Sequence, residues 1–315
     1  MVRSKLLTVA AATLLSQLVQ ARYRLDTLYD SSNFFDEFNH INYPDPTHGF
    51  VEYVDRQTGQ TDGLSGIKNG TIYMGVDHTT ANPPSGRRSV RLESQKTFTQ
   101  GLFIADIAHM PTNACGVWPA FWTYGDDWPN SGEIDILEGV NTQTSNQVSL
   151  HTSQGCEMSS FGASRGCTVV SKDCGSQSGC SQTTSDNQNY GDGFNAIGGG
   201  VYAMEWTDYR IAVWFFPRSD IPSDIAAGEP HPILWDKPMA SFSAGLTCDI
   251  PKKFTNNRIV FDTTFCGDWA GSVWQNNGEC QALGSCKDYV ASNPEAFAQA
   301  YWSVNSVKVY KSSLL

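Results

Sequence analysis

Basic residues are scarce in this sequence. Its 315 residues include 21 Lys and Arg against 32 Asp and Glu, so the formal net charge at pH 7 is −11. A surface with this excess of negative charge repels the phosphate backbone of nucleic acids and the anionic headgroups of membranes. The composition therefore argues against nucleic acid and membrane surfaces as partners, and a neutral substrate is expected.

Long apolar runs are also missing, apart from one near the N-terminus. The run from Leu6 to Val19 is shorter than the roughly 20 residues that a membrane span needs. Arg3 and Lys5 precede it and small residues ending at Ala21 follow, which is the pattern of a cleavable secretory signal. We expect a signal peptide at residues 1–21 and secretion of the mature protein, whose net charge would be about −13 without Arg3 and Lys5.

The sequence has no Cys-x-x-Cys pair, which argues against a zinc site. In an exported chain its nine cysteines indicate disulfides, and the odd number leaves at least one unpaired: Cys115, Cys156, Cys167, Cys174, Cys180, Cys248, Cys266, Cys280 and Cys286. Four of them lie in a Gly- and Ser-rich stretch from Gln154 to Gly200, which we expect to be a long loop pinned by disulfides. Asn69, in Asn69-Gly70-Thr71, is a candidate glycosylation site.

Helical periodicity is nearly confined to Cys286–Tyr301, where one short amphipathic segment interrupted by Pro294 is expected. Elsewhere short segments alternate apolar and polar residues, as in Ile211–Phe215 and Val307–Val309, which is typical of strands with one buried face. The fold class is therefore all-β. No linker or internal repeat is evident, so residues 22–315 are expected to form a single domain.

Three carboxylates fall within six positions of an apolar segment, Gly132-Glu133-Ile134-Asp135-Ile136-Leu137-Glu138-Gly139. Buried carboxylates cost several kcal/mol unless they are paired or used. In a regular strand Glu133 and Asp135 share a face, whereas Glu138 points to the other. A β-bulge between Asp135 and Glu138 restores the parity, so that all three acids line one surface. The opposite, core-facing side would then be supplied by Ile134 with Ile136 or Leu137.

Two carboxyl groups about 5–5.5 Å apart can cleave a glycosidic bond with retention, whereas about 6.5–9.5 Å favours inversion. The spacing of these acids permits the shorter separation on a bent strand but does not prove it. Asp135 would orient Glu133, and repulsion among the acids would raise the pKa of the member that stays protonated, for which Glu138 is the candidate. The alternative is a calcium site or a solvated acidic turn, but calcium loops space their acids with Gly and Asn in polar sequence.

The segment from Gly132 to Asn141 resembles the signature of glycoside hydrolase family 16, in the Glu-x-Asp-x-x-Glu form that is typical of laminarinases. Matching segments elsewhere include Asp45–Val51, Gly116–Trp122, Tyr202–Thr207 and Phe265–Gly271. The resemblance implies a jelly-roll β-sandwich of two antiparallel sheets with a concave substrate cleft. It also implies a retaining fungal endo-β-1,3(4)-glucanase. We expect its reaction to need no cofactor and no catalytic metal, and the presence of a structural calcium stays open. By this resemblance Glu133 is the nucleophile, Asp135 its helper and Glu138 the acid/base.

Seven further residues are candidate substrate contacts: Arg91, Trp118, Trp122, Trp128, His151, Glu205 and Trp274. The apolar faces of sugar rings stack on indoles, although tryptophan in a sandwich is more often part of the core. His151 follows the acidic segment on the next expected strand, and Arg91 and Glu205 match polar site positions of the family. A structural hydrogen bond is the alternative for His151 and Glu205, and a solvated strand residue is the alternative for Arg91.

Two alternative functions stay open. A transglycosylase would use the same carboxylates and pass the sugar to another sugar instead of to water. A non-catalytic glucan-binding lectin on the same sandwich would lack the acids, so the set Glu133, Asp135 and Glu138 argues against it. We expect a monomer whose partner is a neutral β-glucan polysaccharide.

Overall fold

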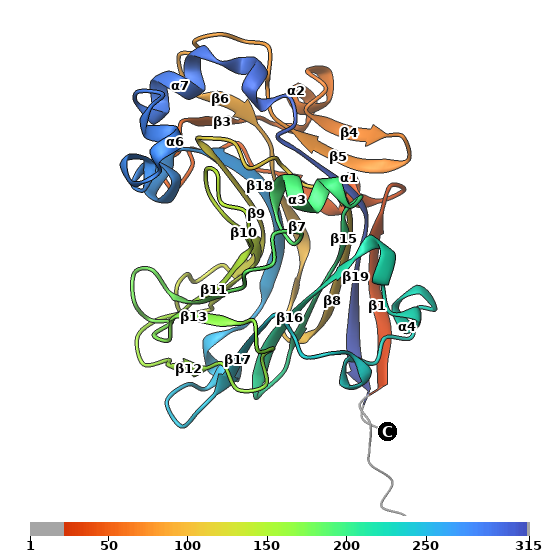
Figure 1. Ribbon diagram of the computed structural model, residues 1–315. Coiled ribbons are helices and arrows are strands. Elements are labelled where there is room, and N and C mark those ends of the chain that lie inside the picture. The colour runs from red at the N-terminus through yellow and green to blue at the C-terminus, as the bar shows by residue number, and fades with distance from the viewer. Residues whose placement is uncertain (1–21, 314–315) are drawn as a thin grey trace, which may run out of the picture.

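The computed structural model describes residues 22–313, so the predicted signal peptide at 1–21 lies outside the described residues. Two large antiparallel sheets pack face to face, and a group of short helices covers one end of the sandwich (Figure 1). The all-β prediction is confirmed. Between residues 22 and 313, no helix is both long enough and apolar enough to cross a membrane.

The back sheet has the strand order β12-β17-β16-β15-β8-β19-β5-β4, with β1 paired to β19. Along β15, Met204 and Trp206 belong to the core between the sheets, whereas Ala203 belongs to a smaller cluster on the outer side. The strands are Arg22–Asp30 (β1), Ser65–Lys68 (β4), Thr71–Gly75 (β5), Gly101–His109 (β8), Met158–Ser159 (β12), Gly200–Trp206 (β15), Arg210–Pro217 (β16), Ala240–Ala244 (β17) and Tyr301–Ser313 (β19).

The front sheet has the order β13-β14-β11-β10-β9-β18-β7-β2. It curves so that its outward side forms a concave face (Figure 1). Its strands are Phe38–His40 (β2), Arg91–Phe98 (β7), Val117–Gly125 (β9), Glu133–Glu138 (β10), Gln147–His151 (β11), Thr168–Ser171 (β13), Cys180–Thr183 (β14) and Asn257–Phe265 (β18). A parallel pair stands apart, formed by Val51–Tyr53 (β3) and Arg87–Ser89 (β6).

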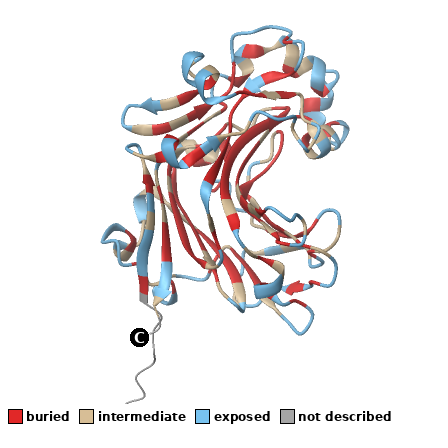
Figure 2. Cartoon of the chain, turned by 180° about the vertical axis from the view of Figure 1, so that it is seen from behind, coloured by how far each residue is buried: buried red, intermediate tan, exposed pale blue. Residues whose placement is uncertain are grey.

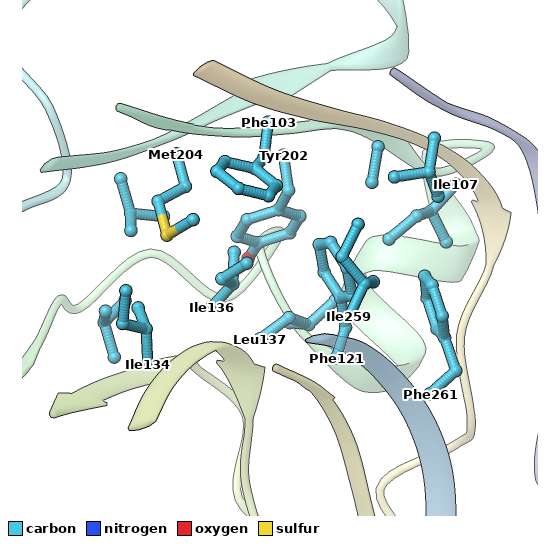
Figure 3. Close-up of a cluster of buried hydrophobic side chains, with 14 of the residues drawn as sticks. Phe103, Ile107, Phe121, Ile134, Ile136, Leu137, Tyr202, Met204, Ile259 and Phe261 are labelled. Carbon is cyan, nitrogen blue, oxygen red and sulfur yellow. The ribbon is translucent and has the colours of Figure 1, made fainter. Parts of the chain in front are cut away.

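The main core lies between the two sheets. Buried residues run along the facing strands of both sheets (Figure 2). In the close-up, Ile136 and Leu137 of β10 point towards Tyr202 and Met204 of β15 (Figure 3). The apolar side chains of β10 therefore anchor the strand, and its acids are left to the other face.

A second core lies under the helices at one end of the sandwich, where Trp274 packs with Val290 and Phe297. The predicted helical segment is present as α7 followed by a 3-10 turn at Pro294. Short helices also occur where none was predicted, because elements of four to seven residues show little periodicity. The helices are Phe34–Glu37 (α1), Arg56–Thr61 (α2), Gly191–Ala196 (α3), Ser223–Ala226 (α4), Ile250–Lys253 (α5), Gly278–Gln281 (α6) and Cys286–Ser292 (α7), with single turns at Arg218–Asp220, Pro232–Leu234, Gly267–Gly271, Trp274–Asn276 and Pro294–Phe297.

Four disulfides form among the cysteines: Cys115–Cys280, Cys156–Cys248, Cys174–Cys180 and Cys266–Cys286. Cys167 is free, as the odd count requires. The stretch Gln154–Gly200 is pinned by disulfides as predicted. It is not only a loop, however, because it supplies β12 to the back sheet and β13 and β14 to the front sheet.

Candidate active site

The acidic strand β10 carries the β-bulge that its sequence predicted. The register with β9 shifts by one residue between Asp135 and Leu137, which leaves Ile136 as the extra residue. A shift of one residue restores the alternation of side chains, so Glu133, Asp135 and Glu138 share the concave face. The bulge also lets both candidate apolar residues, Ile136 and Leu137, face the core.

Glu133 and Asp135 differ in exposure although they are only two residues apart. The Glu133 side chain is 18% exposed and the Asp135 side chain 3%. Trp128 donates its indole N–H to Glu133 Oε2 at 2.7 Å. Burial, followed by the nearby charge of Glu133, raises the pKa of Asp135 well above its ordinary value. Asp135 therefore holds a proton that it can share with Glu133.

Glu138 is more deeply buried than Glu133. It is 9% exposed, and burial raises its pKa to about 8. The indole N–H of Trp118, which donates to Glu138 Oε1 at 2.8 Å, acts against this shift, and the charge of Glu133 adds to it. Below that pH the group carries a proton, which is the state that a general acid needs.

A fourth carboxyl, Asp262 of β18, shares this face. Ala120 of β9 pairs with Glu138 on one side and with Asp262 on the other. Burial raises the pKa of Asp262 to about 7, against the effect of the nearby Arg91. Arg91 Nη1 lies 3.7 Å from Asp262, and Nη2 lies 2.9 Å from Glu93. Arg91 is therefore on the concave face as predicted but only 3% exposed, and its contact with a sugar stays a prediction.

Three of the predicted tryptophans gather around the carboxylates. Trp122 stacks on Tyr124 with 5.2 Å between ring centroids and lies over the Arg91 guanidinium. Trp118 and Trp128 each donate a hydrogen bond to a catalytic candidate, and Trp128 is 55% exposed. The structure thus gives two indoles a role that the sequence did not indicate, which is to hold the carboxylates. Stacking of these rings on sugars stays a prediction.

His151 of β11 pairs with Glu133 of β10, which brings it beside the acids as predicted. Its Nε2 lies 3.5 Å from Asp135 Oδ2 and 3.9 Å from Glu133 Oε1. These three residues offer ligand atoms that all lie within 4.8 Å of one another, so they could hold a cation. Glu133 is one of the three, so a cation held there would compete for the carboxylate of the nucleophile candidate.

Residues 38–310 match the family model described as XgeA-like, catalytic GH16 domain. The chain belongs to glycoside hydrolase family 16. An endo-1,3(4)-beta-glucanase of Arthroderma benhamiae is 44% identical over 306 residues, which is 94% of this chain and 66% of that protein. The chain thus spans less than two thirds of that relative, and it spans 49% of a probable endo-1,3(4)-beta-glucanase of Aspergillus clavatus.

Solved structures of family 16 share this fold. An elongating GH family 16 beta-1,3-glucosyltransferase is 45% identical with a TM-score of 0.85, covering 92% of this chain and 100% of that chain. Laminarinase 16A of Phanerochaete chrysosporium, with 6-O-glucosyl-laminaritriose in its donor and acceptor sites, is 43% identical with the same TM-score and coverage. The two structures carry names for different outcomes on one fold, so fold similarity alone does not separate hydrolysis from transfer.

The family resemblance placed Glu205 in the cleft, and that placement is wrong. Glu205 lies on the outer side of the back sheet, where Tyr23 donates to Oε1 at 2.9 Å and Arg210 to Oε2 at 2.5 Å. With Trp214 it lines a hollow of about 450 Å³ there. Alternation along β15 turns Glu205 away from the core, but it does so whichever sheet includes the strand, so it does not tell whether Glu205 reaches the cleft.

The predicted sugar contact at Trp274 is also wrong. Trp274 is 2% exposed and donates its indole N–H to the Gly284 carbonyl at 2.8 Å. Its ring packs on Tyr289 in the second core. The indole is therefore closed to a sugar. Two disulfides, Cys115–Cys280 and Cys266–Cys286, hold the segment that surrounds it, and the sequence did not reveal their pairing.

Two residues of the site were missed. Asp262 lies in the apolar segment Val260-Phe261-Asp262, so the argument that singled out the acids of β10 could have found it. Asn146 bonds the backbone of the bulge through its side chain, and no pattern in the sequence signals that role.

Proposed function

We propose that this chain is a retaining endo-β-glucanase that hydrolyses internal β-1,3 bonds, or β-1,4 bonds in mixed-linkage chains, of neutral β-glucans. One observation carries the proposal. Two glutamates on one face have different environments, since Glu138 is buried with a pKa raised to about 8 while Glu133 is more exposed and bonded by Trp128. Environments of this kind assign one carboxyl as acid and the other as nucleophile.

The reaction would proceed by double displacement. The Glu133 carboxylate attacks the anomeric carbon while Glu138 gives its proton to the departing glycosidic oxygen, so that a glycosyl ester forms and the C–O bond breaks. Glu138, now ionised, takes a proton from water, and the resulting hydroxide displaces Glu133 from the sugar. Asp135 shares its proton with Glu133 and limits the negative charge on the pair.

A β-glucan is the substrate class that similar proteins favour. The Arthroderma relative is named for activity on β-1,3(4)-glucan, and the laminarinase of Phanerochaete holds glucosyl-laminaritriose. A neutral polymer also suits a chain with a net charge of −11. We propose that the protein acts outside the cell as a monomer, with a signal peptide at residues 1–21 and one catalytic domain over 22–315. Four disulfides and an exposed Asn69 in the turn between β4 and β5 support export.

Replacing Glu133 with Gln tests the assignment directly. Release of reducing ends from laminarin should fall by several orders of magnitude, while circular dichroism shows an unchanged fold, because the amide is similar in size but cannot act as the nucleophile. Activity close to that of the unmodified enzyme would refute the role of Glu133. Retention is tested separately by NMR, where the first product should be the β-anomer.

Transglycosylation is the second candidate function, and it is supported by the similarity to an elongating glucosyltransferase. The glycosyl ester on Glu133 would then be captured by a sugar hydroxyl in place of water. Sizing the products from a defined laminari-oligosaccharide separates the two outcomes. Chains longer than the starting sugar at early times indicate transfer, whereas shorter chains alone indicate hydrolysis.

A further inference from the structure

The bulge interrupts the ladder between β10 and β11. Pairing with β11 covers Glu133, Ile134 and Asp135 and then stops. The Ile136 carbonyl and the Glu138 N–H lie beyond the last pair, in a part of the molecule where both residues are buried. Buried backbone groups need a partner, because an unpaired one costs as much as a lost hydrogen bond.

One side chain serves both groups. Asn146, the residue just before β11, donates from Nδ2 to the Ile136 carbonyl at 2.8 Å and accepts at Oδ1 from the Glu138 N–H at 2.9 Å. A primary amide carries the same donor and acceptor as a peptide unit. The Asn146 side chain therefore replaces the peptide that β11 would have supplied, and it spans the residues on which the position of Glu138 depends.

Asn146 is itself held firmly. It is fully buried. Its backbone N–H donates to Asn189 Oδ1 at 2.9 Å, and its carbonyl accepts from Thr183 Oγ1 at 2.9 Å. Asn189 is also buried and donates to Thr184. The bulge is thus tied through Asn146 to the end of β14 and to the stretch between β14 and α3.

We propose that Asn146 is a positioning residue that sets where the Glu138 carboxyl stands relative to the leaving oxygen. The inference rests on the proposed function, because it assumes that Glu138 is the general acid. It predicts a specific defect. Loss of the two bonds lets the backbone at Glu138 shift, and proton transfer suffers while the nucleophile Glu133, which lies on the paired part of β10, keeps its place.

The test compares two leaving groups. In Asn146→Ala, kcat/KM for laminarin should fall on the order of a hundredfold, the loss expected from a catalytic group misplaced by about 1 Å. For a dinitrophenyl glycoside of laminaribiose, kcat/KM should change little, because dinitrophenolate leaves without a proton. If Asn146→Ala does not fold, Asn146→Asp keeps the acceptor for the Glu138 N–H and should show the same contrast in weaker form.

A matched control variant removes an equivalent pair of hydrogen bonds between an asparagine side chain and the backbone in another part of the fold. Asn195 donates to the Met110 carbonyl at 2.9 Å and accepts from the Met110 N–H at 3.0 Å. Asn195→Ala should lower the melting temperature as Asn146→Ala does but leave kcat/KM for both substrates unchanged. The proposal is overturned if both Asn146 variants lose kcat/KM equally on the two substrates. It is also overturned if Asn195→Ala lowers kcat/KM for laminarin as much as Asn146→Ala does.

The variant Glu138→Ala tests the proposed function separately from the role of Asn146. In this variant kcat/KM should be lost for laminarin and retained for the dinitrophenyl glycoside, because kcat/KM reports the first displacement, in which this leaving group needs no proton. If Glu138→Ala shows no such contrast, Glu138 is not the general acid and the proposed function fails. If Glu138→Ala shows the contrast and the Asn146 variants do not, only the role of Asn146 is refuted.

Discussion

Glu138 combines burial with a single strong donor, and its titration should therefore be visible in activity. The pKa of Glu138 is raised to about 8 by burial, and the Trp118 N–H lowers it because that bond favours the ionised form. Activity needs the protonated form, so kcat/KM should fall on the alkaline side near that value.

Trp118→Phe should move this alkaline limb to higher pH, because removing the donor raises the pKa of Glu138 further. The measurement is kcat/KM for a laminari-oligosaccharide from pH 4 to 10. Trp128→Phe is the control, since Trp128 bonds Glu133 and its loss should leave the alkaline limb near its original position. An alkaline limb that moves to lower pH in Trp118→Phe would contradict the prediction.

The same group makes stability depend on pH. The folded-state pKa of Glu138 lies near 8 against an ordinary value of 4.5, so the folded protein holds the proton more tightly. Its contribution to stability is complete below about pH 4.5 and is lost as the pH rises through 8. Glu138→Gln has no proton to lose. Its free energy of unfolding relative to the unmodified protein should therefore improve with pH across this window, by at most roughly 1.4 kcal/mol for each pH unit.

Urea unfolding at pH 5 and at pH 9 checks this prediction. Glu279→Gln is the matched control, because Glu279 is exposed on α6 and its substitution should give the same difference at both pH values. A Glu138→Gln variant whose advantage shrinks towards pH 9 would show that Glu138 is not the buried acid described here.

Among the strands, β10 has an acidic face and an apolar face within its six residues. Leu137 is fully buried between the sheets, opposite the face that carries the acids. Leu137→Ala should lower the free energy of unfolding by about 2–5 kcal/mol, the usual cost of a buried leucine with its residual cavity. Leu283→Ala, at a position that is 45% exposed, should change it by no more than about 0.5 kcal/mol. Chemical denaturation of both variants is the measurement, and equal losses would contradict the orientation of β10.

This element was also the most predictable from sequence. Few arrangements keep all three acids of this apolar segment out of the core between the sheets, so Glu133, Asp135 and Glu138 predicted both the bulge and its place. The strands β13 and β14 were not predicted, because Thr168–Ser171 and Cys180–Thr183 are short and rich in polar residues. Backbone pairing to β11 and to each other, not an apolar face, makes them strands.

For the whole molecule, two disulfides join the helical end to the sandwich. Cys115 precedes β9 and bonds Cys280 of α6, and Cys266 follows β18 and bonds Cys286 of α7. Replacing Cys115 and Cys280 together by Ser should lower the free energy of unfolding by about 2–5 kcal/mol, because the bond closes a long loop in the unfolded chain. Cys167→Ser breaks no disulfide and should leave the melting temperature nearly unchanged. Thermal unfolding compares the two, and a larger effect at Cys167 would contradict the pairing.

Contacts between distant segments explain the site predictions that the sequence got wrong. Whether Trp274 meets a sugar depends on partners more than a hundred residues away, such as Cys115, which is 165 positions from Cys280. Whether Glu205 lies in the cleft depends on which sheet includes β15, and the alternation of side chains along the strand is the same in either sheet. Family resemblance predicted the sandwich and its concave face, whereas side-chain contacts between distant segments came only from the structure.

The pairing of β1 with β19 has a practical consequence for engineering. Arg22 and Ser313 are cross-strand partners, so a tight turn could join them and close the backbone into a ring. New ends could then be opened at the tip between β17 and α5, where Leu246 is fully exposed. Such a circular permutant would keep every strand of both sheets, and it would move the attachment points for a fused tag or carrier to another part of the surface.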